Sequence, residues 1–108
     1  MKRRPIMIIY NVTCNVENDI LQDWLQWMVE IHIPDVMQTG FFSEANINKV
    51  LSSNDDGNTY AIAYSCESIK KLHEYQLKFS ADLQKKHIER YGEKVVAFRT
   101  ILELIRKF

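Results

Sequence analysis

The order in which hydrophobic periodicities follow one another is the strongest constraint on the fold of this chain. An alternating apolar run is followed by a helical stripe, two more alternating runs, a second helical stripe and a last alternating run. Period-two alternation is typical of strands, whereas apolar residues at three- and four-residue spacing indicate amphipathic helices. The sequence therefore predicts an α+β fold of β-α-β-β-α-β order that occupies residues 1–108 as a single domain.

The predicted strands cover residues 5–15, 41–51, 59–66 and 95–105, and the predicted helices cover residues 20–33 and 69–91. Ser68 is expected to cap the second helix, and residues 53–57 are typical of a hairpin turn. Pro34 is expected to break or kink the first helix, because the residue before a proline disfavours α geometry. Right-handed crossovers then predict a four-stranded antiparallel sheet with both helices on one face.

The sheet face opposite the helices is predicted to be unusually apolar. Strand 5–15 is apolar on both faces near its start, and strand 95–105 has Ile101 and Ile105 on one face with Phe98 and Leu102 on the other. Monomeric proteins rarely expose a large contiguous apolar patch. We therefore expect a homodimer that packs two sheets face to face around a cavity. The alternative is a monomer with a modest exposed patch.

Composition argues against several classes of function. The chain has 14 basic and 14 acidic residues, so no net field attracts nucleic acid or anionic lipid. Strand 59–66 also lacks the glycine and the basic residue of an RNA-recognition motif. The apolar run at residues 6–9 follows three basic residues, but Asn11 and Thr13 interrupt it, unlike the core of a signal peptide. We expect a cytoplasmic protein with neither nucleic acid nor membrane as a partner.

The glycines and cysteines offer no cofactor motif. Gly40 and Gly92 follow the predicted helices, and Gly57 lies in the hairpin turn, which leaves no glycine for a phosphate-binding loop. Cys14 and Cys66 fall at opposite ends of the sheet, about 20 Å apart, so they are expected to be free thiols. The sequence thus predicts no cofactor.

His32 is the best candidate for acid–base chemistry. It ends the first helix beside the stripe that contains Trp24 and Trp27, where partial burial shifts a histidine pKa. A capping or packing role is the alternative. His73 and His87 lie about 21 Å apart along the second helix, so they cannot share a metal ion, and both are expected at its surface or edge.

Arg99, Asn11 and Tyr64 are the candidate ligand-binding residues. If strands 5–15 and 95–105 pair centre to centre, Arg99 and Asn11 lie opposite each other on one face, inside the cavity between the two sheets. A guanidinium and an amide suit an anionic or carbonyl-bearing ligand, and Tyr64 adds a phenol. The alternative is that Arg99 forms an ion pair with Glu103 or with the partner subunit and binds no ligand.

Four segments together resemble a family of small uncharacterised bacterial proteins, a domain of unknown function. They are Ile9-Tyr10-Asn11-Val12-Thr13, Trp24-Leu25-Gln26-Trp27-Met28, His32-Ile33-Pro34 with Thr39-Gly40-Phe41-Phe42, and Phe98-Arg99-Thr100. The resemblance covers nearly the whole chain. It implies a ferredoxin-like fold of the dimeric α+β barrel group and brings no established activity.

More distantly, His32-Ile33-Pro34 after an aromatic-rich helix is similar to the His-x-Pro segment of ethyl tert-butyl ether degradation-type proteins. The wider group includes cofactor-free monooxygenases and haem-degrading enzymes. The haem-degrading members typically use a tryptophan near the third strand and the second helix, whereas both tryptophans here fall in the first helix.

Two classes of function stay open, and with them the question of whether the protein is an enzyme. A small-molecule-binding or accessory protein is favoured, because the residues assemble no nucleophile triad, general-base pair or metal cluster. The alternative is a cofactor-free monooxygenase or isomerase that acts on a small aromatic or carbonyl compound. In that case His32 is the acid or base, and Asn11 and Arg99 orient an oxyanion.

Overall fold

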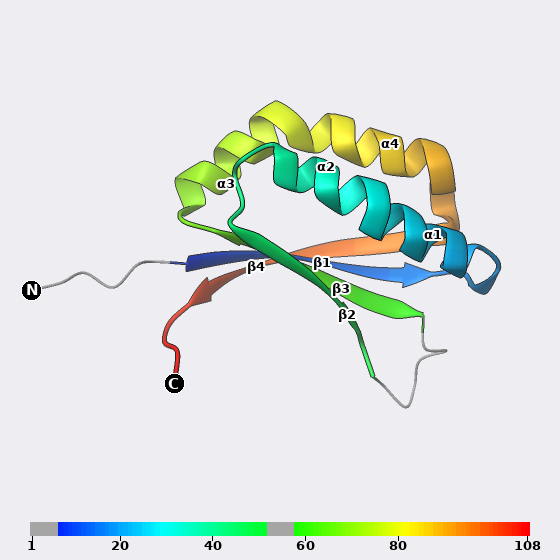
Figure 1. Ribbon diagram of the computed structural model, residues 1–108, viewed down its shortest axis with the longest axis horizontal. Helices are drawn as coiled ribbons and strands as arrows, with labels where there is room; N and C mark the ends of the chain where they lie inside the picture. The colour runs from blue at the N-terminus through cyan, green and yellow to red at the C-terminus, as the bar shows by residue number, and fades with distance from the viewer. Residues whose placement is uncertain (1–6, 52–57) are drawn as a thin grey trace, which may run out of the picture.

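The computed structural model describes residues 7–51 and 58–108. Its strands are β1 (Met7–Val16), β2 (Glu44–Lys49), β3 (Thr59–Cys66) and β4 (Val95–Leu104). They form one antiparallel sheet in the order β2-β3-β1-β4, and the helices all cover the same face of it (Figure 1). The predicted fold class is confirmed. The hairpin turn predicted at residues 53–57 lies outside the described residues.

The first helical segment continues through Pro34, so the predicted break is wrong. α1 (Leu21–Trp27) leads through a π-helical turn (Met28–His32) into α2 (Ile33–Gln38). Ile33 keeps helical geometry, with φ −61° and ψ −44°. Pro34 lies in the first turn of α2, directly after the π turn, and the first turn of a helix is where a proline is tolerated. Gly40, at φ 83°, lies just beyond the end of this segment.

The second helical segment is built in the same way. α3 (Ile69–Tyr75), a π-helical turn (Gln76–Ser80) and α4 (Ala81–Tyr91) follow one another. The predicted cap is confirmed, because Ser68 Oγ accepts a hydrogen bond from the backbone N–H of Lys71 at 3.1 Å. Gly92 ends the segment at φ 56°, a backbone conformation that residues with a Cβ atom rarely adopt. Within the described residues, neither helical segment has the length and apolarity needed to cross a lipid bilayer.

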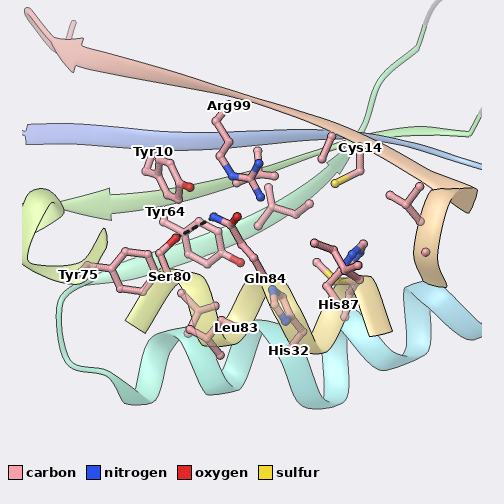
Figure 2. Close-up of a pocket in the computed structure, with 18 residues that line it drawn as sticks. Tyr10, Cys14, His32, Tyr64, Tyr75, Ser80, Leu83, Gln84, His87 and Arg99 are labelled. Atoms are coloured by element: carbon pink, nitrogen blue, oxygen red, sulfur yellow. Dashed lines mark hydrogen bonds between the residues drawn. The ribbon is translucent and has the colours of Figure 1, made fainter. Parts of the chain in front are cut away.

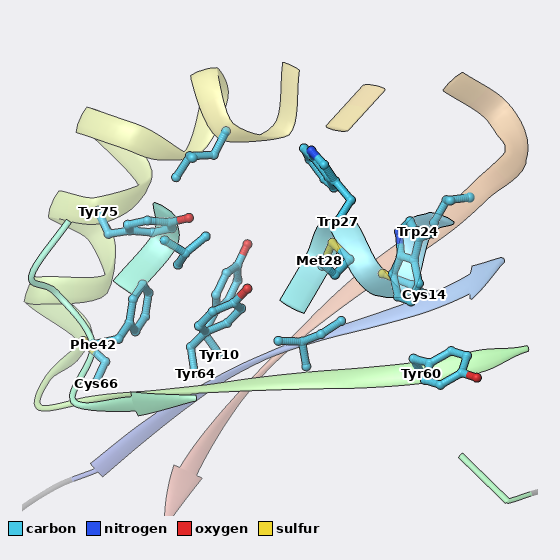
Figure 3. Close-up of a cluster of buried hydrophobic side chains, with 14 of the residues drawn as sticks. Tyr10, Cys14, Trp24, Trp27, Met28, Phe42, Tyr60, Tyr64, Cys66 and Tyr75 are labelled. Carbon is cyan, nitrogen blue, oxygen red and sulfur yellow. The ribbon is translucent and has the colours of Figure 1, made fainter. Parts of the chain in front are cut away.

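The core lies between the helices and the sheet. Every second residue of β3 points toward the helices and is buried, which confirms the predicted alternation. Trp24, Ile62 and Leu72 are 0% exposed. A cluster of aromatic rings fills one end of the core, with centroid distances from 4.8 to 6.3 Å; its members are Tyr10, Phe42, Tyr64 and Tyr75 (Figure 3).

No helix of the described residues covers the opposite face of the sheet, and the exposed apolar residues of that face gather on β4. Val96, Phe98 and Leu102 are 67%, 62% and 46% exposed. Phe98 pairs with Thr13 in the neighbouring strand, and Leu102 pairs with Ile9. The prediction that this face exposes large apolar side chains is confirmed, but the residues differ from those expected, because Ile101 and Arg99 pair with the helix-facing Tyr10 and Val12.

Candidate ligand-binding cavity

A cavity of about 240 Å³ lies between the sheet and the helices, over β1 and β4 (Figure 2). Its walls come mainly from the strands β1, β3 and β4, from both π-helical turns and from α4. The exposed lining residues all lie between the last turns of α4 and the middle of β4; they are Ile88, Gly92, Ala97 and Arg99. The cavity therefore opens between α4 and β4, and its inner end lies among the buried residues of β1 and β3.

Three tyrosine hydroxyls meet this cavity without a protein partner. Tyr10, Tyr64 and Tyr75 line the cavity and are only 4%, 3% and 4% exposed. Among the described residues, none of the three hydroxyls has a hydrogen-bond partner, yet none is sealed inside the protein. Tyr91 differs, since its hydroxyl donates to Asp23 Oδ2 at 2.8 Å. The partners of these three hydroxyls therefore enter through the cavity, as water or as a ligand.

Arg99 extends from β4 into the space between sheet and helices, as Figure 2 shows. It forms no hydrogen bond or ion pair with any described residue, so the ion pair with Glu103 that we considered is not made. Its charge nevertheless acts on the cavity: Arg99 contributes to lowering the pKa of His87 and partly offsets the raised pKa of Cys14. The guanidinium is therefore available to a ligand at the cavity mouth.

Asn11 is not part of the cavity, and its predicted pairing with Arg99 is wrong. The register of β1 and β4 places Asn11 opposite Thr100 and Val12 opposite Arg99. An offset of one residue sends two strand side chains to opposite faces of a sheet. Asn11 lies on the uncovered face, where its Nδ2 donates to Thr13 Oγ1 at 3.0 Å. The cavity found here thus lies on the helix side of the sheet, not on the side where a second sheet was expected.

His32 and His87 meet at the cavity wall, with their ring centroids 5.9 Å apart. Burial lowers the pKa of His32 to about 4, and the neighbouring His87 adds to that effect. Burial, followed by the charge of Arg99, also lowers the pKa of His87. Both imidazoles are therefore neutral at pH 7. The predicted partial burial of His32 is confirmed, His73 is exposed as expected, and His87 is half-buried, which fits the helix-edge position that was also expected.

The buried Trp24 fixes the tautomer of His87. Trp24 Nε1 donates a hydrogen bond to His87 Nε2 at 3.0 Å, so the proton of the neutral imidazole is on Nδ1. A sequence signal for this position exists. His87 lies four residues after Leu83 and four before Tyr91, and these two buried residues mark one stripe of the helix. Following that stripe to its end would have placed His87 on the buried side of its helix.

Further polar groups complete the wall. Gln84 Nε2 donates to Ser80 Oγ at 2.8 Å, and both residues line the cavity. Cys14 contributes a neutral thiol, because burial raises its pKa to about 11. Cys14 and Cys66 are both free and buried, as predicted. Among the described residues, no group of three His, Cys, Asp or Glu side chains could hold a metal ion. The wall thus offers hydrogen-bond donors and one cation rather than a nucleophile.

The fold and the cavity define a ferredoxin-like α+β domain with a small-molecule-sized hollow under its helices. Residues 7–105 match the family described as "Domain of unknown function (DUF4286)". The chain belongs to this family, as the four sequence segments indicated. No curated protein is detectably similar to the chain.

Solved structures share this fold at low sequence identity. An ethyl tert-butyl ether D (EthD) family protein from Bacillus halodurans C-125 is 9% identical with a TM-score of 0.69, covering 91% of this chain and 99% of its own. A dimeric ferredoxin-like protein from an uncultured marine organism is 6% identical with a TM-score of 0.69, covering 97% and 100%. A hydroxynitrile lyase from Passiflora edulis is 15% identical with a TM-score of 0.66, covering 92% and 95%. Likeness at such identities establishes the fold alone.

Proposed function

We propose that this protein binds a small organic molecule in the cavity between α4 and β4, as a binding or accessory protein rather than as an enzyme. The observation that carries this proposal is a cavity into which three buried tyrosines direct hydroxyls that have no partner among the described residues; they are Tyr10, Tyr64 and Tyr75. None of these hydroxyls is sealed off, so water can pair with them in the empty protein, and a molecule that enters replaces those hydrogen bonds. A few polar groups that converge in a largely apolar cavity are typical of a ligand-binding site.

The size of the cavity limits the ligand. Sites for drug-sized molecules usually measure about 300–1,000 Å³, and this cavity measures about 240 Å³. The ligand is therefore smaller than a typical drug, on the scale of a single ring with one or two substituents. His32, Arg99 and Tyr64 line its site, whereas Asn11 does not.

An enzyme of the cofactor-free type is the second candidate, because His32 lies in the same cavity as Arg99 and the phenols. The Passiflora hydroxynitrile lyase shows that this fold can hold an enzyme. General bases work best with a pKa near the working pH. His32, with a pKa of about 4, needs about 4 kcal/mol to take up a proton at pH 7. That cost favours binding over acid–base catalysis.

A fragment screen with a matched pair of variants tests the binding proposal. Wild-type protein is screened against a library of neutral and charged fragments by ligand-observed NMR. Ala97→Leu adds bulk at the mouth of the cavity, and Ala81→Leu adds the same atoms on the exposed face of α4. We expect hits that bind wild type and Ala81→Leu but are lost with Ala97→Leu. A screen without hits, or hits that all survive in Ala97→Leu, would contradict the proposal.

We also propose that the partner of this chain is a second copy, bound through the uncovered face of the sheet. Val96, Phe98 and Leu102 form an exposed apolar row on that face, and a dimeric protein of the same fold shows that such subunits can pair. We expect the dimer to be cytoplasmic, where the thiols of Cys14 and Cys66 stay reduced.

Light scattering coupled to size-exclusion chromatography tests this assembly. Phe98→Glu places a charge on the uncovered face, and Leu77→Glu places one on a helix residue that is 88% exposed. We expect wild type and Leu77→Glu to elute as dimers and Phe98→Glu to elute as a monomer. A monomeric wild type at micromolar concentration would exclude the dimer.

A further inference from the structure

We propose that the ligand of this cavity is a small monoanion, a carboxylate or phenolate with a compact apolar body. This inference rests on the proposed binding function and narrows it to one charge and one chemical class. Three features of the cavity wall support it: one uncompensated positive charge, several hydrogen-bond donors and a set of apolar side chains.

The cavity wall carries a single full charge. Among the described residues that line it there is no Asp, Glu or Lys, and Arg99 is the one arginine. Arg99 has no partner within the described part of the chain, so its charge is not compensated by the protein. A ligand with one negative charge pairs with it. A second negative charge would lie unpaired among neutral groups, which is costly in a partly buried site.

The two histidines do not add a second positive charge. His87 Nε2 accepts the hydrogen bond from Trp24, which is 0% exposed. A protonated imidazole has donors on both nitrogens and no acceptor, so charging His87 breaks this bond and leaves the indole N–H buried without a partner. His32 packs against the rings of Trp27 and His87, at centroid distances of 5.0 and 5.9 Å, and burial there disfavours its charged form. The site therefore stays at one positive charge near pH 7.

The phenols of the wall add hydrogen-bond donors to the guanidinium. The hydroxyls of Tyr64 and Tyr75 stay protonated because burial raises the pKa of both phenols, that of Tyr75 to about 12. Phenol O–H groups and a guanidinium together suit an oxygen that carries charge and accepts several hydrogen bonds. An oxyanion satisfies these donors better than a neutral amide or alcohol does.

Apolar side chains provide the rest of the site. Val36, Ile62 and Leu83 line the cavity and are 2%, 0% and 8% exposed. Such a wall favours a hydrocarbon body beside the oxyanion, because burying apolar surface is favourable. An inorganic anion such as phosphate would leave this part of the wall without contacts and is therefore not the expected ligand.

A charge series measured by isothermal titration at pH 7 tests the inference. The probes are benzoate, benzamide, phthalate and benzylamine, which share a ring and differ in charge; cyclohexanecarboxylate varies the shape of the body at constant charge. We expect one or both monoanions to bind at least about tenfold more tightly than benzamide and phthalate, and benzylamine not to bind. In Arg99→Met the monoanions should fall to the affinity of benzamide. Arg106→Met, outside the cavity, should leave every affinity unchanged.

The outcomes separate this inference from the binding function on which it rests. If benzamide or another neutral fragment binds as tightly as the monoanions and is lost with Ala97→Leu, the cavity binds small molecules but the charge assignment is wrong. If neither benzoate nor cyclohexanecarboxylate binds while the fragment screen yields cavity hits, the inference also fails. If no probe and no fragment binds, the binding function itself fails.

Discussion

β3 and β4 flank the same central strand, β1, and have equivalent positions that face the helices. Large buried side chains occupy these positions on β3 but not on β4. On either side of Val12 lie Ile62 of β3, which is 0% exposed, and Arg99 of β4, which is exposed. At the next helix-facing position of β1 the flanking residues are Tyr60, 8% exposed, and Ala97, which is exposed. The large side chains of Ile62 and Tyr60 pack into the core on the β3 side. On the β4 side, the small Ala97 and the charged Arg99 leave space between the sheet and the helices.

This difference indicates that the β3 side stabilises the fold and that the β4 side forms the cavity. Packing of large apolar residues against the helices stabilises the β3 side, because each buried aliphatic side chain contributes about 1.5–3 kcal/mol. The β4 side gives up part of that stabilisation and gains space beside Arg99, which has no partner among the described residues; phenols from β1, β3 and α3 also line this cavity. Sites of binding are commonly less than optimal for stability.

Truncating matched isoleucines on the two sides should have the largest effect. Ile62→Ala on β3 removes a side chain that is 0% exposed, and we expect it to lower the free energy of unfolding by about 3 kcal/mol. Ile101→Ala on β4 removes the same atoms from a helix-side position that is 47% exposed, with an expected loss of about 1 kcal/mol or less. Urea denaturation at pH 7 measures both. Equal losses would contradict the division into a packed side and an open side.

Acidification should destabilise the cavity wall through His32. The unfolded chain binds a proton on this histidine near its ordinary pKa of 6.5, whereas the folded chain does so only near 4. The stability that comes from a neutral His32 is therefore present above pH 6.5 and is lost as the pH falls toward 4. Between pH 7 and 4.5 this group should remove about 2 kcal/mol from the free energy of unfolding.

The variant His32→Phe isolates this contribution. A phenyl ring can keep the contact with Trp27 but does not titrate, so the variant should lose about 2 kcal/mol less than wild type over the same pH range. Urea denaturation curves at pH 7 and 4.5 provide the values. His73→Phe, on an exposed position of α3, is the matched control. The account of the histidine pair fails if His32→Phe and wild type lose stability equally.

Two tyrosine-to-phenylalanine changes should differ by a smaller amount. Tyr91→Phe removes a hydroxyl that donates to Asp23, and we expect a loss of about 1 kcal/mol. Tyr64→Phe removes a hydroxyl that has no partner among the described residues, and we expect no loss of stability or a slight gain. Thermal unfolding of the unliganded protein compares the two. A loss for Tyr64→Phe as large as that for Tyr91→Phe would show that its hydroxyl is paired.

The fold could be predicted from the sequence because its signals are local. Hydrophobic periodicity identified the strands and helices, the hydroxyl of Ser68 marked a helix start, and glycines marked the helix ends. Pro34 was misinterpreted because the π-helical turn before it depends on the surrounding packing rather than on one residue.

The site could be predicted only in part, because it depends on strand register. His32, Tyr64 and Arg99 were named from their residue types and all line the cavity, but Asn11 does not. A shift of one residue between β1 and β4 moves a side chain to the other face, and nothing local in either strand specifies that register. His87 was missed because it was compared with His73 on its own helix and not with the first helix across the core.

The resonance of the Arg99 side-chain Nε–H during a benzoate titration tests the central claim most directly. Comparison of nitrogen–proton correlation spectra of wild type and Arg99→Lys assigns this signal. If the cavity under β4 binds a small monoanion at the free guanidinium, the signal should shift and saturate with the same dissociation constant that calorimetry gives. An unchanged Arg99 signal in the presence of saturating benzoate would contradict the account.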